Sequence, residues 1–391
     1  SNEIVYEIIA AAGWSDDRID LKKFLHDYSA ARYGGCPEGI DRFWSGMLQS
    51  SYNECTNNAR YRWQLRPYSH RMPTMGINEN YYTAIEQFLA CAGELGGNKL
   101  YRTDAIQYAA LYLASKADML LEAANWADLY GAREEAYDCA MRIEELLLDA
   151  DRLLASHPLL RLDRWSGMAR RAGCTEEEKE RFVGESRRLI SVWGGPSLSD
   201  YSARVWSGVI RDYYVPRLNK YLEAKTDGIV FDFRTWDEQW HASRTVSRVE
   251  PFADPLAAAC RLVGEARGIT PAQNRRPADA VAFWSPFELT KPSVNLSFTI
   301  GWDQFEKARA LRIVPIRGHD PVKVTAIRCS ANRYDRAREE VSLEVGPAGG
   351  AVEIPLHKLQ APDPLSKEVT VYIRIEGKAA ADNYAAVELA Y

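Results

Sequence analysis

The chain has 391 residues, of which 46% are hydrophobic and 26% charged, and it contains 11 tryptophans and 21 tyrosines. This composition is typical of a globular protein with a large core and room for two or three domains. The net charge of −5 excludes a global basic field that would attract nucleic acid or an anionic membrane, so we expect neither as a partner.

The first residues, SNEIVYEIIAAAGW, enter a helical pattern at once and lack an initiator methionine. We therefore interpret the chain as a piece of a longer protein, with Ser1 as the remnant of a tag. No apolar run reaches the ~20 residues that cross a bilayer, and no signal peptide is visible.

Basic residues concentrate in one place, the stretch RYRWQLRPYSHR at 60–71. Because the whole chain is acidic, we interpret this stretch as a solvated or domain-docking loop and not as a polyanion site. A protein-interaction surface formed by this loop is the weakest of the functions that we consider.

Cysteines and histidines show no metal-ligand spacing. The seven cysteines form no CxxC pair, and His70, His157 and His241 are isolated. This pattern predicts free thiols and argues against a disulfide framework or a zinc site. Free thiols are typical of a reducing compartment. We expect no metal and no organic cofactor.

Helical periodicity runs from residue 3 to about residue 268, which predicts an all-α bundle over about residues 1–270. A T-x-x-E capping box, Thr175 with Glu178, marks one helix start. The acidic run 176–178 then forms the first turn of that helix, where carboxylates favour the positive end of the dipole. The predicted core stripes are Ile106, Leu113, Ala117 and Leu120 in segment 101–125, and Tyr137, Met141, Glu144, Leu148, Leu153 and Leu154 in segment 131–156.

Beyond residue 280 the apolar period becomes two, as in SVNLSFTIGW at 293–302 and VTVYIRIEG at 369–377. Shorter strand candidates are LRIVPI, VKVTAI, AVEIPL and AVELAY, separated by Gly- and Pro-rich turns. We therefore predict an antiparallel β-sandwich over about 280–391. The predicted organisation is a helical domain at 1–224, a partly helical connector at 225–279 and the sandwich at 280–391.

The stretch SVWGGPSLSDYSARVWSGVIRDYY at 191–214 breaks a helical pattern and restarts it at once. Gly194 or Gly195 is expected in the left-handed conformation that ends a helix at Trp193. Ser197 and Asp200 read as an S-x-x-D capping box, so we predict a new helix from Leu198. Trp193, Leu198 and Tyr201 would then cluster at an edge of the bundle.

This stretch resembles the C-terminal helical domain of glycoside hydrolase family 89, the α-N-acetylglucosaminidases. Further similarity occurs at 2–14, 31–35, 51–53 and 71–75, in the order of that family, and it covers roughly residues 2–270. Departures are Ser202 in place of the usual Ala, an additional Gly195, and Leu218 in place of a common Trp. The matching residues are Trp193, Gly194, Leu198, Ser199, Asp200, Tyr201, Ser202, Arg204, Gly208, Val209, Asp212, Tyr213, Tyr214, Pro216 and Arg217.

The resemblance implies that Trp193, Leu198 and Tyr201 help to wall a pocket for a terminal, α-linked N-acetylglucosamine. An indole can cover an apolar sugar face, and a phenol can reach a sugar oxygen. From spacing alone, core packing of Trp193 and Tyr201 would be favoured. The resemblance favours the pocket wall instead, and less strongly for Leu198.

In that family a (β/α)8 barrel carries the two catalytic carboxylates of a retaining glycosidase. This chain has no run of alternating strands and helices, so we assign no catalytic residue to it and expect no catalysis without the barrel. Asp200 reads as a cap, and Asp212 and Glu250 are isolated. The implied partners are this barrel and a glycan that ends in α-N-acetylglucosamine.

The alternative is a non-catalytic carbohydrate-binding or structural accessory protein. In it the sandwich would bind sugar through exposed aromatic residues such as Trp284 and Trp302. The strand alternation at 293–302 instead places Trp302 in the core.

Overall fold

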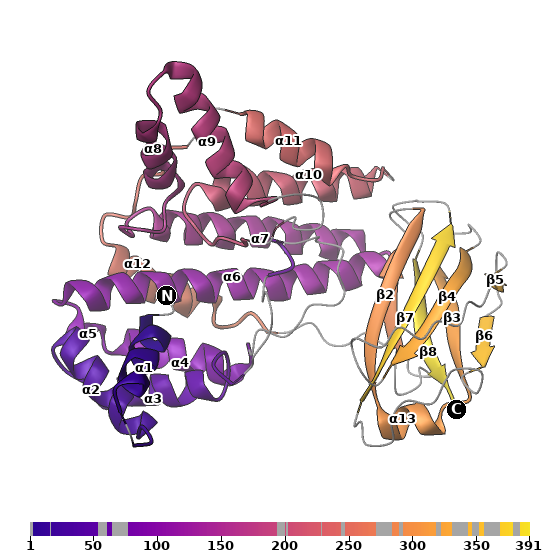
Figure 1. Cartoon of the computed structure of the whole chain (residues 1–391), viewed down its shortest axis with the longest axis horizontal. Helices are drawn as coiled ribbons and strands as arrows, with labels where there is room; N and C mark the ends of the chain where they lie inside the picture. Colours follow the sequence, from indigo (N-terminus) through magenta and orange to yellow (C-terminus); the bar gives the residue numbers. More distant parts are fainter. Residues whose placement is uncertain are drawn as a thin grey trace.

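The computed structural model describes residues 3–15, 17–53, 61–64, 77–193, 200, 202–227, 229–243, 247–270, 284–288, 292–317, 322–330, 343–345, 352–355, 368–377 and 384–391 (Figure 1). Helices form the first part of the chain and antiparallel strands the second, as the two sequence periods predict. Among the described helices, none is long and apolar enough to cross a membrane.

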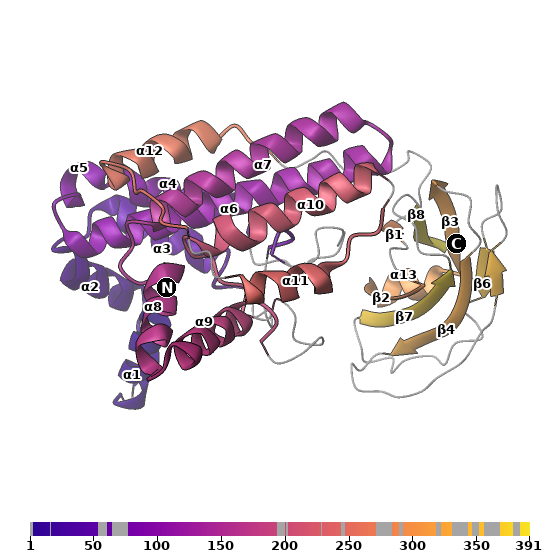
Figure 2. The same ribbon diagram turned by 90° about the horizontal axis from the view of Figure 1, so that it is seen from above.

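Two long helices, α6 and α7, lie across the middle of the helical part, with α2 to α5 on one side and α8 to α11 on the other (Figures 1 and 2). Helix α12 packs against α6 (Figure 2). The helices are α1 (Glu3–Gly13), α2 (Leu21–Tyr33), α3 (Glu38–Leu48), α4 (Glu79–Ala90), α5 (Ala92–Leu95), α6 (Lys99–Leu129), α7 (Arg133–Leu154), α8 (Leu162–Ala172), α9 (Glu176–Ile190), a π-helical turn η2 (Ile210–Tyr214), α10 (Val215–Thr226), α11 (Phe233–Ala242) and α12 (Pro255–Ala266).

Helix α6 is the centre of the helical core. The Asn98 side chain begins it by accepting hydrogen bonds from the backbone N–H groups of Leu100 and Tyr101. Of the predicted stripe, Ile106, Leu113 and Ala117 are buried and Leu120 is half-buried against the core. The long helix is thus covered by neighbours along most of its length.

The predicted stripe of α7 is right at its C-terminal end, where Leu153 and Leu154 are buried and Leu148 packs half-buried against the core. Tyr137 and Met141 are exposed, so that part of the prediction is wrong. The buried face follows the aliphatic positions that recur at three- and four-residue spacing, a more uniformly apolar stripe than one that begins at a tyrosine and includes Glu144. The buried residues are Ile143, Leu146, Leu147, Ala150, Asp151, Leu153 and Leu154.

The capping box at the start of α9 is confirmed. The Thr175 hydroxyl accepts the N–H of Glu178, and the Glu178 carboxylate accepts the N–H of Thr175. The acidic residues 176–178 occupy the first turn of this helix, as expected.

The second part of the chain is a sandwich of two four-stranded antiparallel sheets, with strand orders β1-β8-β3-β6 and β2-β7-β4-β5. Val369, Val371, Ile373 and Ile375 lie on the inner face of β7 and are buried, as the alternation predicts. The strands are β1 (Trp284–Glu288), β2 (Ser293–Gly301), β3 (Ala310–Arg317), β4 (Val322–Ser330), β5 (Leu343–Val345), β6 (Val352–Pro355), β7 (Glu368–Gly377) and β8 (Tyr384–Ala390).

Trp302 begins the short helix α13 (Trp302–Lys307) and does not continue strand β2. Its ring stacks on Phe305 with 5.7 Å between centroids, and it packs half-buried against the sandwich core. The prediction that the strand includes Trp302 is therefore wrong, but the predicted contact of Trp302 with the core is present. Trp284 lies in β1, and its side chain is outside the described part of the structure. The domain boundaries at 224/225 and 279/280 stay predictions.

Candidate functional site

The predicted pocket residues lie in the segment between α9 and η2, which we call the 191–208 loop. Trp193 is 42% exposed, and its backbone N–H donates to the Arg188 carbonyl at 2.8 Å at the end of α9. Leu198 and Tyr201 lie outside the described residues. The assignment of all three to a pocket wall stays a prediction, and the exposure of Trp193 is compatible with it.

The predicted helix from Leu198 is wrong at residues 202–206, which are not helical. Regular helix resumes only at η2 and continues into α10. Trp193, Asp200 and Ala203 have φ angles of 54°, 59° and 41°, a left-handed conformation that is uncommon for residues other than glycine. Such strained positions persist only where surrounding contacts hold them, and they cluster at functional sites.

Asp200 is held by a buried ion pair. Its carboxylate Oδ1 accepts a 2.8 Å hydrogen bond from Nη1 of Arg217, and both side chains are 1% exposed. Ser197, the other half of the predicted S-x-x-D capping box, lies outside the described residues, so the box stays a prediction. A buried guanidinium requires a counter-charge, and the Asp200 carboxylate supplies one to Arg217.

Arg217 connects the loop to three other elements. Its Nη1 donates to Tyr213 Oη at 2.8 Å, its Nη2 donates to the Gln64 carbonyl at 2.5 Å, and Asp237 Oδ1 lies 3.5 Å away. The Tyr213 hydroxyl donates to Asp237 at 2.5 Å. Burial lowers the pKa of Arg217, but the carboxylates of Asp200 and Asp237 more than offset this, so the group stays charged.

Three more contacts hold the loop in place. The Asp200 N–H donates to the Ser191 carbonyl at 2.7 Å, and the buried Ser191 hydroxyl lies 2.5 Å from Nε2 of His241. Gln64 Nε2 donates to the Ala203 carbonyl at 2.9 Å. The exposed Trp193 therefore stands on a loop whose anchors are buried on both sides.

The segment that follows is anchored by a third carboxylate. Asp151, fully buried on α7, accepts the N–H of Gly208 at 2.7 Å and pairs with Nε of Arg211 at 3.2 Å. Burial raises the pKa of Asp151 to about 6, although these donors favour its ionised form. Gly208 has φ 84°, and a Cβ there would lie 3.0 Å from Cβ of Leu162, so the position requires glycine.

A shallow cavity of about 290 Å³ opens beside this segment, bounded by α6, the end of α7 and residues 203–206. It combines an amide, a guanidinium and an indole with apolar walls, a mixture that suits a small polar ligand. The Trp206 ring stacks on Trp165 at 5.8 Å. The lining residues are Gln107, Ala110, Leu111, Leu154, Leu160, Ala203, Arg204, Val205 and Trp206.

His157 holds the turn that leads to Leu160, one of the residues that line this cavity. Its Nδ1 accepts the N–H groups of Leu159 and Leu160 at 3.1 and 3.2 Å, so this nitrogen is unprotonated. Burial lowers the pKa of His157 to about 4. The side chain is thus a neutral structural acceptor, in line with the interpretation of an isolated histidine.

Sequence reasoning missed Arg217 as an anchor, together with Gln64 and Asp237. The signal was present as an arginine in the apolar run YYVPRL at 213–218, since such a residue must find carboxylates if it is buried. It also missed a group of metal-ligand side chains formed by His26, Cys36 and Asp41, which lies between α2 and α3. Of the basic stretch at 60–71, Arg62 pairs with Asp118 at 3.0 Å and with Glu122, and residues 60 and 65–71 are outside the described part, so the interpretation as a loop stays a prediction.

Comparisons with known proteins agree with this architecture. The chain is 28% identical over 240 residues to human alpha-N-acetylglucosaminidase, which covers 58% of this chain and 32% of the human protein. It therefore spans about a third of the length of that curated relative.

Two solved structures of a family 89 glycoside hydrolase from Clostridium perfringens share the fold. The complex with PUGNAc has a TM-score of 0.59 at 22% identity and covers 69% of this chain and 34% of that chain. A variant in complex with its substrate GlcNAc-alpha-1,4-galactose has a TM-score of 0.60 at 22% identity and covers 68% and 33%.

The family described as the alpha-N-acetylglucosaminidase (NAGLU) C-terminal domain matches residues 24–265, more than half of the chain and nearly all of its helical part. This range contains the 191–208 loop, its buried anchors and the cavity. The resemblance found in the sequence is confirmed, and the chain belongs to the alpha-N-acetylglucosaminidase C-terminal domain family.

Proposed function

We propose that this chain is the C-terminal part of an α-N-acetylglucosaminidase-like glycoside hydrolase. Its helical part walls the pocket for a terminal, α-linked N-acetylglucosamine, and Trp193 covers one face of the sugar. The catalytic carboxylates lie on a (β/α)8 barrel outside this chain. The observation that carries the proposal is a 42% exposed indole on a loop whose anchors, Asp200 and Arg217, are each 1% exposed.

Rigidity of the loop matters for this role. A pocket wall lowers the cost of binding when its side chains are already placed before the ligand arrives. The buried pair of Asp200 and Arg217 fixes the backbone at Asp200 in its left-handed conformation. The side chain of Gln64 binds the Ala203 carbonyl and so fixes the segment that continues to the cavity. If Trp193 served only to fill the hydrophobic core, its indole would be buried.

Exposed apolar side chains on α1 support the presence of a missing partner surface. Tyr6 is 72% exposed and Ile9 61% exposed, and Trp14, just after the helix, is 94% exposed. Large apolar groups that gather on one surface helix are typical of a covered face. Because the chain belongs to this family, we propose that the barrel covers this face of α1.

Complementation tests the proposal. The chain alone should not hydrolyse an aryl α-N-acetylglucosaminide, because neither carboxylate of a catalytic pair is assigned to it. Mixing it with a separately expressed (β/α)8 barrel of a family 89 enzyme should restore hydrolysis, and the barrel alone should be weakly active or inactive. Full activity of the barrel alone, or none in the mixture when both parts are folded, would refute the division of roles.

A further inference from the structure

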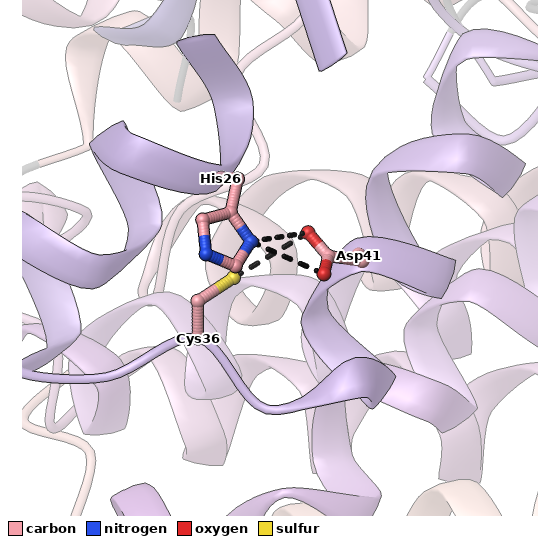
Figure 3. A group of neighbouring side chains, drawn as sticks. All are labelled: His26, Cys36 and Asp41. Carbon is pink, nitrogen blue, oxygen red and sulfur yellow. Dashed lines mark hydrogen bonds and ion pairs between the residues drawn. The ribbon is translucent and has the colours of Figure 1, made fainter. Parts of the chain in front are cut away.

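Three side chains with different donor atoms meet between helices α2 and α3 (Figure 3). Nδ1 of His26 lies 3.0 Å from Oδ1 and 3.2 Å from Oδ2 of Asp41. The Cys36 thiol donates to the same Oδ1 at 3.5 Å. The nitrogen, sulfur and oxygen atoms all lie within 4.8 Å of one another.

The backbone brings these residues together. His26 lies within α2, which ends at Gly34 with φ 79° and a hydrogen bond from its N–H to the Ala30 carbonyl. Pro37 begins α3, so Cys36 is fixed between two helix boundaries, and Asp41 follows in the first turn of α3. A second contact joins the two helices: Nε1 of Trp44 on α3 donates to the Ser29 hydroxyl on α2 at 2.7 Å.

The donor set matches that of zinc sites. Imidazole nitrogen, thiolate sulfur and carboxylate oxygen are the three ligand types that Zn²⁺ takes in proteins, at distances of about 2.0–2.3 Å. Tetrahedral bonds of that length place ligand atoms about 3.3–3.7 Å apart, and the contacts of 3.0 and 3.5 Å with Asp41 require only small shifts.

Charge at the cluster favours a cation. Within the described residues, neither lysine nor arginine forms an ion pair with Asp41, whose polar side-chain partners are His26 and Cys36. The His26 and Asp41 side chains are 48% and 36% exposed, so an ion can reach them from solvent. The group is therefore both accessible and short of positive charge.

We propose that His26 through Nδ1, Cys36 through Sγ and Asp41 through its carboxylate bind one Zn²⁺ ion, with water as the fourth ligand. The ion replaces the thiol proton, which is released to solvent, and the proton that Nδ1 of His26 donates to Asp41 gives way to the metal, so that the bound imidazole carries its proton on Nε2. The bound ion links α2 to α3 near the start of the family domain. This site is independent of the function proposed for the 191–208 loop.

The test is zinc binding by the full chain. The chain is stripped with a chelator and titrated with ZnCl₂ against a chromophoric zinc indicator. Cys36→Ser, His26→Gln and Asp41→Asn are compared with Cys174→Ser, which removes an exposed thiol elsewhere. We expect one tight ion per chain, a loss of affinity of at least about tenfold in each cluster variant, and no change in Cys174→Ser.

A second readout identifies the sulfur ligand. Co²⁺ in the zinc site should give a thiolate-to-metal absorption band that disappears in Cys36→Ser and remains in Cys174→Ser. His26 is exposed, so His26→Gln is expected to fold even if Cys36→Ser does not, which circular dichroism would show. Absence of zinc binding at micromolar concentrations, or binding that is unchanged in folded cluster variants, would overturn the proposal and leave the three contacts as ordinary hydrogen bonds.

Discussion

At the scale of single residues, buried polar groups determine the shape of the loop that carries Trp193. Arg217 is 1% exposed and contacts Asp200, Tyr213 and the Gln64 carbonyl. If one partner of a buried ion pair is removed, the other charge stays buried with neither a counter-charge nor water to stabilise it. The stability of the loop therefore depends on this one guanidinium.

Arg217→Ala should lower the free energy of unfolding by about 3–5 kcal/mol, because the Asp200 carboxylate would stay buried without its partner. Urea denaturation measures this change. The matched control is Arg102→Ala, which breaks a pair with Asp254 whose side chains are 39% and 60% exposed and should cost about 0–1 kcal/mol. Equal losses in the two variants would contradict the anchoring role.

His157 should make stability depend on pH. Its folded pKa of about 4 lies below its ordinary value of 6.5, so its contribution is present above pH 6.5 and is lost as the pH falls toward 4. The loss amounts to about 3 kcal/mol at the lower end, at about 1.4 kcal/mol per pKa unit.

His157→Asn checks this directly, since the amide oxygen can accept the same backbone N–H groups but does not titrate. Denaturation curves of both proteins are compared between pH 7 and pH 4. The wild-type chain should lose stability relative to the variant as the pH falls, and parallel pH profiles would show that His157 does not titrate as described.

At the scale of elements, the sequence periods predicted most of the fold. The capping box of Thr175 and Glu178 is local, so the four residues 175–178 suffice to predict it. The pattern of Ser197 and Asp200 is equally local, but Ser197 lies outside the described residues, and the Asp200 carboxylate pairs with the distant Arg217. The helix from Leu198 could not be rejected from sequence, since the burial of Arg217 is a property of the tertiary structure.

The same reason limits prediction of the site. The sequence predicted a left-handed residue at Gly194 or Gly195, which lie outside the described residues, whereas Trp193 itself has a left-handed φ of 54°, a conformation that spacing does not predict for a tryptophan. The group of His26, Cys36 and Asp41 is separated by ten and five residues, and it comes together only because Gly34 and Pro37 fold α3 back on α2. On α7 the pattern predicted the burial of Leu153 and Leu154 but also placed Tyr137 and Met141 in the core, where packing leaves them exposed.

Alanine substitutions at two glycines should show that the turn at Gly208 requires glycine and that a helical position such as Gly264 does not. Gly208→Ala should cost about 1–3 kcal/mol, because its φ of 84° is unfavourable for alanine and the new Cβ would meet Leu162. The control Gly264→Ala lies in α12 with nothing within 4 Å and should stabilise the chain by about 0.5–1 kcal/mol. Thermal unfolding separates the two, and a neutral Gly208→Ala would contradict the strain at this turn.

At the scale of the whole molecule, two hydrophobic cores are described, one in the helices and one in the sandwich. The family match covers the helical core, and its match ends at residue 265, before the first strand. The function that we propose therefore belongs to the helical part. The half-buried packing of Trp302 against the sandwich core gives no specific support to a sugar-binding platform there.

The central claim is that Trp193 faces the sugar in the assembled enzyme, and steady-state hydrolysis of an aryl α-N-acetylglucosaminide tests it most directly. The chain is combined with its barrel, and Trp193→Ala is compared with Tyr130→Ala, which removes an aromatic ring of equal exposure, 42%, at the end of α6. Loss of a stacking contact worth about 1–3 kcal/mol should lower kcat/KM by about 5- to 150-fold in Trp193→Ala and leave Tyr130→Ala unchanged. Unaltered kcat/KM in a folded Trp193→Ala enzyme would contradict the account.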